Sequence, residues 1–139
     1  MFEETEAAGD LRFAPGGQRV VYSMSGTLFV RPFPGPGPAV RVFPGEGHRA
    51  VWSADGRSLY YEDAEGNIGF VPVDATGEAT AAPTIVVPKE SIEQLLPEYG
   101  DFWFDVARGT NDIFVKVSGS RRHTLTLVQN WPALLRPKR

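Results

Sequence analysis

Short hydrophobic stretches alternate along the whole chain with turns rich in glycine, proline and aspartate. Runs of this kind, bounded by turn residues, are typical of β-strands joined by tight connections. The high content of glycine (15) and proline (12) argues against a long helical bundle. The pattern therefore predicts strands at residues 11–14, 19–23, 27–33, 39–43, 49–53, 58–62, 67–73, 84–87, 102–106, 112–117 and 123–129.

The strand pattern repeats at a spacing of 39 to 40 residues. The segment LRFAPGGQRVVY aligns with AVWSADGRSLYY, and farther along GTLFVRPF aligns with GNIGFVPV. A weaker third copy, FDVARGTNDIFV, follows after a longer interval. About 40 residues is the size of a four-stranded propeller blade. The equivalent positions in the first two copies include Phe13 and Trp52, Gly17 and Gly56, Val20 and Leu59, and Tyr22 and Tyr61.

The second strand of each copy carries three apolar residues in a row, at 20–22, 59–61 and 113–115. Successive side chains on a strand point to opposite faces of its sheet, so these triplets place apolar groups on both faces. An antiparallel sheet with one wet face does not need this, whereas stacked propeller blades do. The triplets therefore predict that each sheet packs against a neighbour on both sides.

The Asp-Gly pair at Asp55 and Gly56 is expected to turn the chain. Glycine accepts a positive φ, and an aspartate carboxylate closes local turns. The first copy has Gly16 and Gly17 at these positions, so the turn is kept while the carboxylate is not. This predicts a structural role for Asp55 and not a catalytic one.

A helical insert is expected at 89–101. Ser91 is predicted to be the N-cap, because Gln94 follows at the spacing of a capping box. Ile92, Leu95 and Leu96 would form its apolar stripe, and Pro97 would end it.

The segments FAPGGQRVVY and WSADGRSLYY resemble the repeat of TolB-type six-bladed β-propellers, whose usual form is Trp-Ser-Pro-Asp-Gly-Lys/Arg before an apolar strand. The order of the copies is similar to propeller domains C-terminal to some bacterial serine/threonine kinases. There, a blade similar to LFVRPFPGPG precedes one similar to WSADGRSLYYEDAEGNIGFVPV, and the last blade ends in a segment similar to LVQNWPALLR. The resemblance implies an all-β partial propeller and no catalytic residues in the propeller. No kinase domain is present in the sequence.

We therefore expect one half-propeller domain over 1–139, made of three four-stranded antiparallel blades at about 10–44, 48–88 and 102–130. Three blades would leave apolar faces exposed at both ends, which soluble monomers avoid. We expect a second chain to complete a six-bladed ring with C2 symmetry. The N-terminal segment of one chain would then supply the last blade of the other with its missing strand. The alternative is a fragment whose remaining blades were cut away.

Charge and composition exclude some classes of partner. The net charge of -3 argues against nucleic acid, which needs a basic face. No apolar run is long enough for a membrane span, and the absence of cysteine removes disulfides and thiolate chemistry. The compartment is left open by these features. A protein or peptide ligand and a homodimer are the expected partners.

Candidate chemistry is sparse. His48 and His123 are the histidines, and no Gly-x-Ser-x-Gly elbow is present, so a Ser/His/Asp triad is not expected. The segment DAEGN at 63–67 offers oxygen ligands for calcium, but a hairpin turn is the preferred interpretation. Asp101 and Asp105 could line a lactonase-like channel; ordinary loop carboxylates are preferred.

We expect a non-enzymatic binding or scaffolding module with no cofactor and no metal. The alternative is an enzyme-associated propeller, such as a lactonase-like hydrolase or a peptidase accessory domain. Exposed aromatic residues near the insert and the chain ends are the predicted contacts with partners, because aromatics are enriched at interface hot spots. These candidates are Phe2, Tyr99, Phe102, Trp103 and Trp131.

Overall fold

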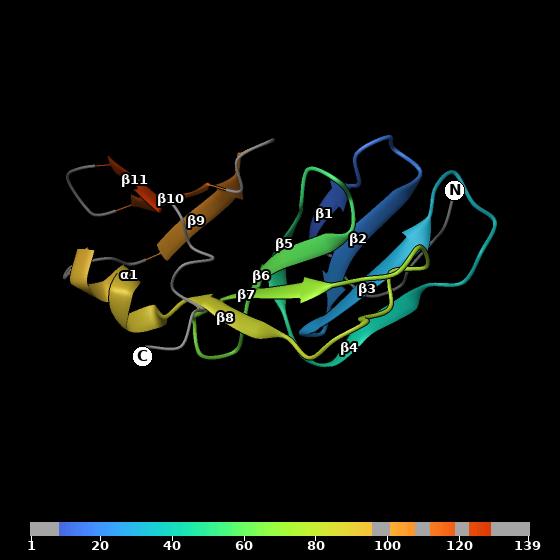
Figure 1. The fold of residues 1–139 in the computed structure, drawn as a ribbon, viewed down its shortest axis with the longest axis horizontal. Coiled ribbons are helices and arrows are strands. Elements are labelled where there is room, and N and C mark those ends of the chain that lie inside the picture. Colours follow the sequence, from blue (N-terminus) through green and yellow to red (C-terminus); the bar gives the residue numbers. More distant parts are fainter. Residues whose placement is uncertain (1–8, 96–100, 108–111, 119–122, 129–139) are drawn as a thin grey trace, which may run out of the picture.

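Three antiparallel β-sheets follow one another along the chain and lie in a row in space (Figure 1). The computed structural model describes residues 9–95, 101–107, 112–118 and 123–128. In each sheet the strands pair in the order in which they occur in the sequence, so that every connection is a hairpin. The architecture is mostly β, as the strand pattern predicts.

The first sheet contains four strands, and its first hairpin turns on two glycines. Gly16 and Gly17 have φ values of 90° and 72°, a region that a residue with a Cβ rarely adopts. The strands are β1 (Gly9–Phe13), β2 (Arg19–Met24), β3 (Thr27–Pro32) and β4 (Val40–Glu46).

The second sheet also contains four strands and repeats this arrangement. Its first hairpin has Gly56 at a φ of 71°, as the Asp-Gly pair predicts. The strands are β5 (His48–Trp52), β6 (Ser58–Glu62), β7 (Ile68–Pro72) and β8 (Thr84–Val87).

The third sheet contains three strands within the described residues, in the order β11-β10-β9. These are the three strands that the sequence predicts for the third copy, and the N-terminal segment that we expect to supply a fourth strand from a second chain lies outside the described residues. The strands are β9 (Asp101–Val106), β10 (Ile113–Ser118) and β11 (His123–Val128).

A short helix, α1 (Lys89–Leu95), connects the second and third sheets. The predicted cap at Ser91 is wrong, because the helix begins at Lys89 and Ser91 lies inside it. Its start is held from the β6–β7 hairpin: the side-chain oxygen of Asn67 accepts a hydrogen bond from the Lys89 backbone N–H at 2.8 Å. The carbonyl of Pro88 accepts another from the Ser91 N–H at 3.0 Å. A cap distant in sequence thus replaces the local capping box. No helix in the described part of the chain is long and apolar enough to cross a membrane.

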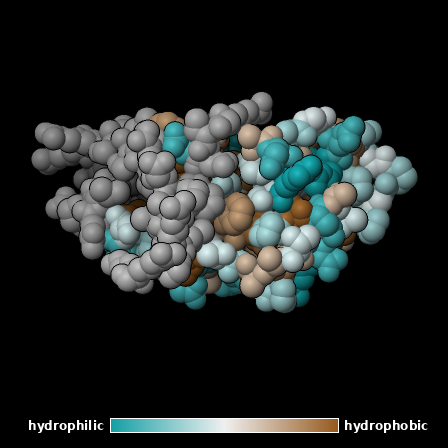
Figure 2. Space-filling model, viewed as in Figure 1, coloured by the Kyte–Doolittle hydropathy of each residue, from teal (hydrophilic) through white to brown (hydrophobic). Residues whose placement is uncertain are grey.

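The hydrophobic core lies between the sheets, in two layers. The layer between the first and second sheets contains Val21 and Val30 from one side and Leu59 and Tyr61 from the other. Tyr61 also lies 5.0 Å from the Phe43 ring of the first sheet, centroid to centroid, and burial raises the pKa of Tyr61 to about 12. The surface over these sheets is mostly hydrophilic or neutral on the face shown in Figure 2, with hydrophobic residues showing in small areas.

The layer between the second and third sheets contains Tyr60, Ile113 and Val115, and the helix adds Ile92. Leu59 and Tyr61 therefore face the first sheet, while Tyr60 between them faces the third. The three side chains are at most 4% exposed. The predicted burial of this triplet on both faces is confirmed, and it requires a neighbouring sheet on each side.

Candidate functional site

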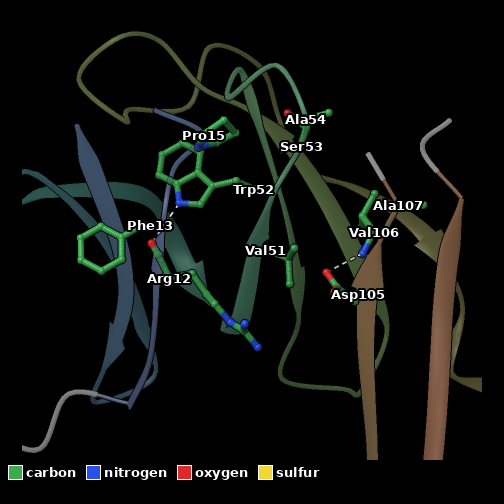
Figure 3. Close-up of a pocket in the computed structure, with 10 residues that line it drawn as sticks. All are labelled: Arg12, Phe13, Pro15, Val51, Trp52, Ser53, Ala54, Asp105, Val106 and Ala107. Carbon is green, nitrogen blue, oxygen red and sulfur yellow. Dashed lines mark hydrogen bonds between the residues drawn. The ribbon is translucent and has the colours of Figure 1, made fainter. Parts of the chain in front are cut away.

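A groove of about 410 Å³ lies where the first strands of the three sheets come together. These strands, β1, β5 and β9, are at the edges of their sheets, and β5 contacts both of the others. Figure 3 shows the side chains around the groove. It is lined by Arg12, Phe13, Pro15, Val51, Trp52, Ser53, Ala54, Asp105, Val106 and Ala107.

Three of the lining residues occupy the same position of the repeat. Arg12, Val51 and Asp105 each lie directly before the residue that aligns with Trp52. Val51 lies between the other two in Figure 3. Arg12 and Asp105 are exposed, while Val51 is half-buried. The groove therefore offers a cation, an apolar side chain and an anion in series, one from each sheet.

Trp52 forms the wall of the groove and joins the first two sheets. Its indole N–H donates a hydrogen bond to the carbonyl of Arg12 at 3.1 Å. The guanidinium carbon of Arg19 lies 4.7 Å from the centre of the Trp52 ring, a cation–π arrangement. Arg19 also donates to the carbonyls of Gly56 at 2.8 Å and Asp74 at 3.2 Å, both in turns of the second sheet. Arg19 and Trp52 thus hold the hairpins of two sheets together at the rim of the groove.

The hairpin after Trp52 is closed by side chains that could be mistaken for catalytic ones. The hydroxyl of Ser53 donates to Asp55 Oδ1 at 2.6 Å and accepts from the Ser58 N–H at 3.1 Å. Asp55 Oδ1 also accepts from the Arg57 N–H at 2.9 Å. The bond from Ser53, followed by that from Arg57, lowers the pKa of Asp55 below its ordinary value. Both side chains serve the turn, as the Gly-Gly pair in the first sheet predicts for Asp55.

The calcium-like segment at 63–67 is also a turn. Asp63 Oδ1 accepts from the N–H groups of Glu65 at 3.0 Å and Asn67 at 2.8 Å, and Gly66 has a φ of 90°. Within the residues that the structure describes, no three His, Asp or Glu side chains come close enough to hold a metal ion.

The lining of the groove contains few side chains that could transfer a proton. Among its lining residues, Arg12 and Asp105 carry ionisable side chains. An arginine stays protonated in proteins and cannot act as a general base. Asp105 Oδ1 accepts from the Val106 N–H at 2.8 Å, which fixes the carboxylate against its own strand. One carboxylate and one permanent cation are suited to holding a ligand.

The contact residues predicted from the sequence stay a prediction. Phe2, Tyr99 and Trp131 lie outside the described residues, and Phe102 and Trp103 lie on β9 with only their backbone described.

Sequence reasoning missed a different exposed group, on the first sheet. Leu11, Phe13 and Phe33 are 45%, 51% and 42% exposed, and the rings of Phe13 and Phe33 meet edge to face at 5.0 Å. The signal that could have found it is the alignment of Phe13 with Trp52, which gives both aromatic residues the same position in the repeat.

Comparison with known proteins supports the fold and no more. No family and no curated protein matches the chain. A solved structure titled "Structure of Dos1 propeller" matches with a TM-score of 0.58 and 17% sequence identity, over 92% of this chain and 34% of that one. The fold is propeller-like.

A second solved structure, a putative 6-phosphogluconolactonase from Bacteroides uniformis, matches with a TM-score of 0.42 and 14% identity, over 91% of this chain and 45% of that one. The chain therefore spans about a third of the Dos1 propeller and less than half of the second protein. The described sheets resemble propeller blades and make a partial propeller. The likeness to TolB-type repeats and to kinase-linked propellers stays a prediction.

Proposed function

We propose that this chain is a protein-interaction module and not an enzyme, and that its groove binds an extended peptide segment. The observation that carries this is the series Arg12, Val51 and Asp105 in the lining of the groove, one residue from each sheet. A peptide segment presents charged and apolar side chains at regular intervals, and this series can receive them. Fold alone does not give function, so the proposal stands on the groove and not on the propeller-like architecture.

The edge strands add a second means of binding. β1, β5 and β9 each end their sheet, and an edge strand has backbone N–H and C=O groups with no neighbour in the ladder. An extended peptide can pair with such groups, while side-chain pockets provide the selectivity. Trp52 already uses one of these groups, the carbonyl of Arg12. A peptide would therefore pair with other backbone groups along these edges.

The experiment is selection of linear peptides from a phage-displayed library on the purified chain. We expect enriched peptides whose affinity falls about tenfold or more for Arg12→Ala and for Asp105→Ala, since each removes a charge that the ligand would pair. Glu65→Ala is the matched control, because Glu65 is exposed on the β6–β7 hairpin and does not line the groove. A library that yields no enriched peptide, or peptides that bind both groove variants as well as the control, would contradict the proposal.

A further inference from the structure

The second sheet packs on the first sheet through one of its two faces. The first sheet has an equivalent face, with a residue at each matching position of the repeat. The second sheet uses Ala50, Trp52, Leu59, Tyr61, Val71 and Val73 for this contact. The equivalent residues of the first sheet are Leu11, Phe13, Val20, Tyr22, Arg31 and Phe33. We call these six residues the outer face. The register supports their placement, since Phe13 pairs with Val20 and Val20 with Arg31, on the side opposite Val21.

The two faces differ in exposure at one end. Ala50, Trp52 and Val73 are 1%, 6% and 6% exposed in the second sheet. Their counterparts Leu11, Phe13 and Phe33 are 42% to 51% exposed. The three positions are apolar in both sheets, so the difference in exposure comes from what packs on each face. The second sheet has the first sheet in front of it, whereas no described sheet lies in front of Leu11, Phe13 and Phe33.

The middle of the outer face is covered within the chain. Val20 and Tyr22 are each 1% exposed, and Phe29 stacks on Tyr22 with ring centroids 5.8 Å apart. The second sheet has Gly69 where the first has Phe29, and this leaves room for the neighbouring sheet. A partner of the outer face therefore gains most contact at Leu11, Phe13 and Phe33.

The third sheet has the complementary face. In β2 and β6 the middle residue of the apolar triplet packs toward the next sheet: Val21 joins Leu59 and Tyr61, and Tyr60 joins Ile113 and Val115. The equivalent residue of the third sheet is Phe114, which pairs with Asp105 and is half-buried. By this rule Phe114 faces the position of a following sheet.

Charge selects the occupant. The equivalent positions along the groove are Arg12, Val51 and Asp105, from the first sheet to the third. If a second copy follows the third sheet, the series continues with the partner's Arg12 directly after Asp105, so that an anion and a cation follow one another along the groove. We propose that a second copy of this chain docks its third sheet on the outer face, covering Leu11, Phe13 and Phe33 and placing Asp105 beside the partner's Arg12. Twofold symmetry makes both contacts of the pair identical.

The first test is the mass of the purified chain in solution, by sedimentation velocity and light scattering at about 1 to about 100 µM. We expect twice the 15.2 kDa chain mass at the upper concentration. Leu11→Asp combined with Phe33→Asp should give the chain mass, because both carboxylates would be buried without a partner at the contact. Ile85→Asp is the control: Ile85 is 49% exposed but lies on β8, outside the outer face. Circular dichroism establishes that each variant is folded.

The second test is a charge exchange. Arg12→Glu and Asp105→Lys should each raise the dimer dissociation constant about tenfold or more, and the two together should restore it, because the pair is kept with its signs reversed. Glu65→Lys, which changes the net charge in the same sense as Asp105→Lys, is the control for that variant.

A wild type that has the mass of one chain at every concentration would overturn the proposal. So would a Leu11→Asp, Phe33→Asp variant that dimerises as well as Ile85→Asp. The same holds if Arg12→Glu and Asp105→Lys together give a dimer no tighter than either substitution alone. A monomeric wild type would mean that some other sheet covers this face.

The inference goes beyond peptide binding and is tested apart from it. Mass is measured with no peptide present, and neither Leu11 nor Phe33 lines the groove. The Leu11→Asp, Phe33→Asp variant should therefore lose the dimer and still bind selected peptides.

Discussion

Trp52 and Phe13 occupy equivalent positions in two neighbouring sheets but have opposite surroundings. Trp52 is 6% exposed, hydrogen-bonded to the first sheet and covered by Arg19. Phe13 is 51% exposed, and its contact is with Phe33 of its own sheet. The local pattern of the repeat makes both sheets alike. What decides the burial of an equivalent residue is whether another sheet lies in front of it.

The two sheets also differ in how the buried tyrosine of the central strand is covered. Phe29 supplies an aromatic ring to Tyr22 from the same sheet, whereas Tyr61 receives Phe43 from the neighbouring one. Gly69, at the position of Phe29, has no room for more: an added Cβ would come within 2.6 Å of the Tyr61 ring. Substitutions at matched positions of the two sheets can therefore separate contacts within a sheet from contacts between sheets.

The largest difference is expected between Trp52→Ala and Phe13→Ala. Removing Trp52 empties a buried site between the sheets and should cost about 3–5 kcal/mol in the free energy of unfolding. Phe13→Ala should cost less than about 1 kcal/mol in the monomer, because half of that side chain is already in water. Urea denaturation at a protein concentration where the chain is monomeric measures both. Equal costs would contradict the assignment of different roles to the two residues.

A smaller difference is expected between Gly77→Ala and Gly16→Ala. Both glycines have a positive φ, at 101° and 90°, so each substitution carries the backbone penalty of about 1–2 kcal/mol. A Cβ on Gly77 would in addition collide with the side chain of Val30 in the first sheet, while one on Gly16 meets nothing within 4 Å. We expect Gly77→Ala to cost about 1–3 kcal/mol more, as overpacking does. Similar unfolding free energies for the two variants would show that the loop at Gly77 is not pressed against the first sheet.

The smallest expected effect is the contribution of Asp55 to the pH dependence of the unfolding free energy. The pKa of Asp55 is lowered in the folded chain, first by the Ser53 hydroxyl and then by the Arg57 N–H. The stabilisation is therefore present above the unfolded pKa near 3.8 and is lost as the pH falls through the lower folded value.

Asp55 is an exposed residue in a turn, so the contribution should stay below about 1 kcal/mol. The unfolding free energy of the wild type should exceed that of Asp55→Asn near about pH 6, and the gap should close toward about pH 3. A gap that is constant over this range would show that the charge of Asp55 does not matter. The Gly16-Gly17 turn of the first sheet has no carboxylate to add a similar term.

Much of the fold could be predicted from the sequence, because the physics involved is local. The eleven strands of the described residues lie within a few residues of their predicted positions, since turn residues and apolar runs fix where strands begin and end. The roles of Asp55 and of the segment at 63–67 followed from a comparison of copies and from turn chemistry. The start of α1 could not be found in this way, because its cap is Asn67, 22 residues away in sequence.

The candidate site was harder to predict, because it is made by neighbours in space. No local motif marks Arg12, Val51 and Asp105, which are 39 and 54 residues apart in sequence. Their common position in the repeat is the signal that unites them, and it becomes visible when the three edge strands are seen together. The alignment of Phe13 with Trp52 gives both residues the same position in the repeat. It does not report whether a sheet lies in front of that position, so the exposure of Phe13 could not be predicted from it.

The most direct measurement of the central claim is hydroxyl-radical footprinting of the wild-type chain below and above the concentration at which it dimerises. If the outer face is a sheet-packing face that a second copy covers, Phe13 and Phe33 should become protected at the higher concentration, while exposed Ile85 keeps its reactivity. Unchanged labelling of Phe13 and Phe33 at a concentration where the mass has doubled would contradict the account, because the copies would then meet through another surface.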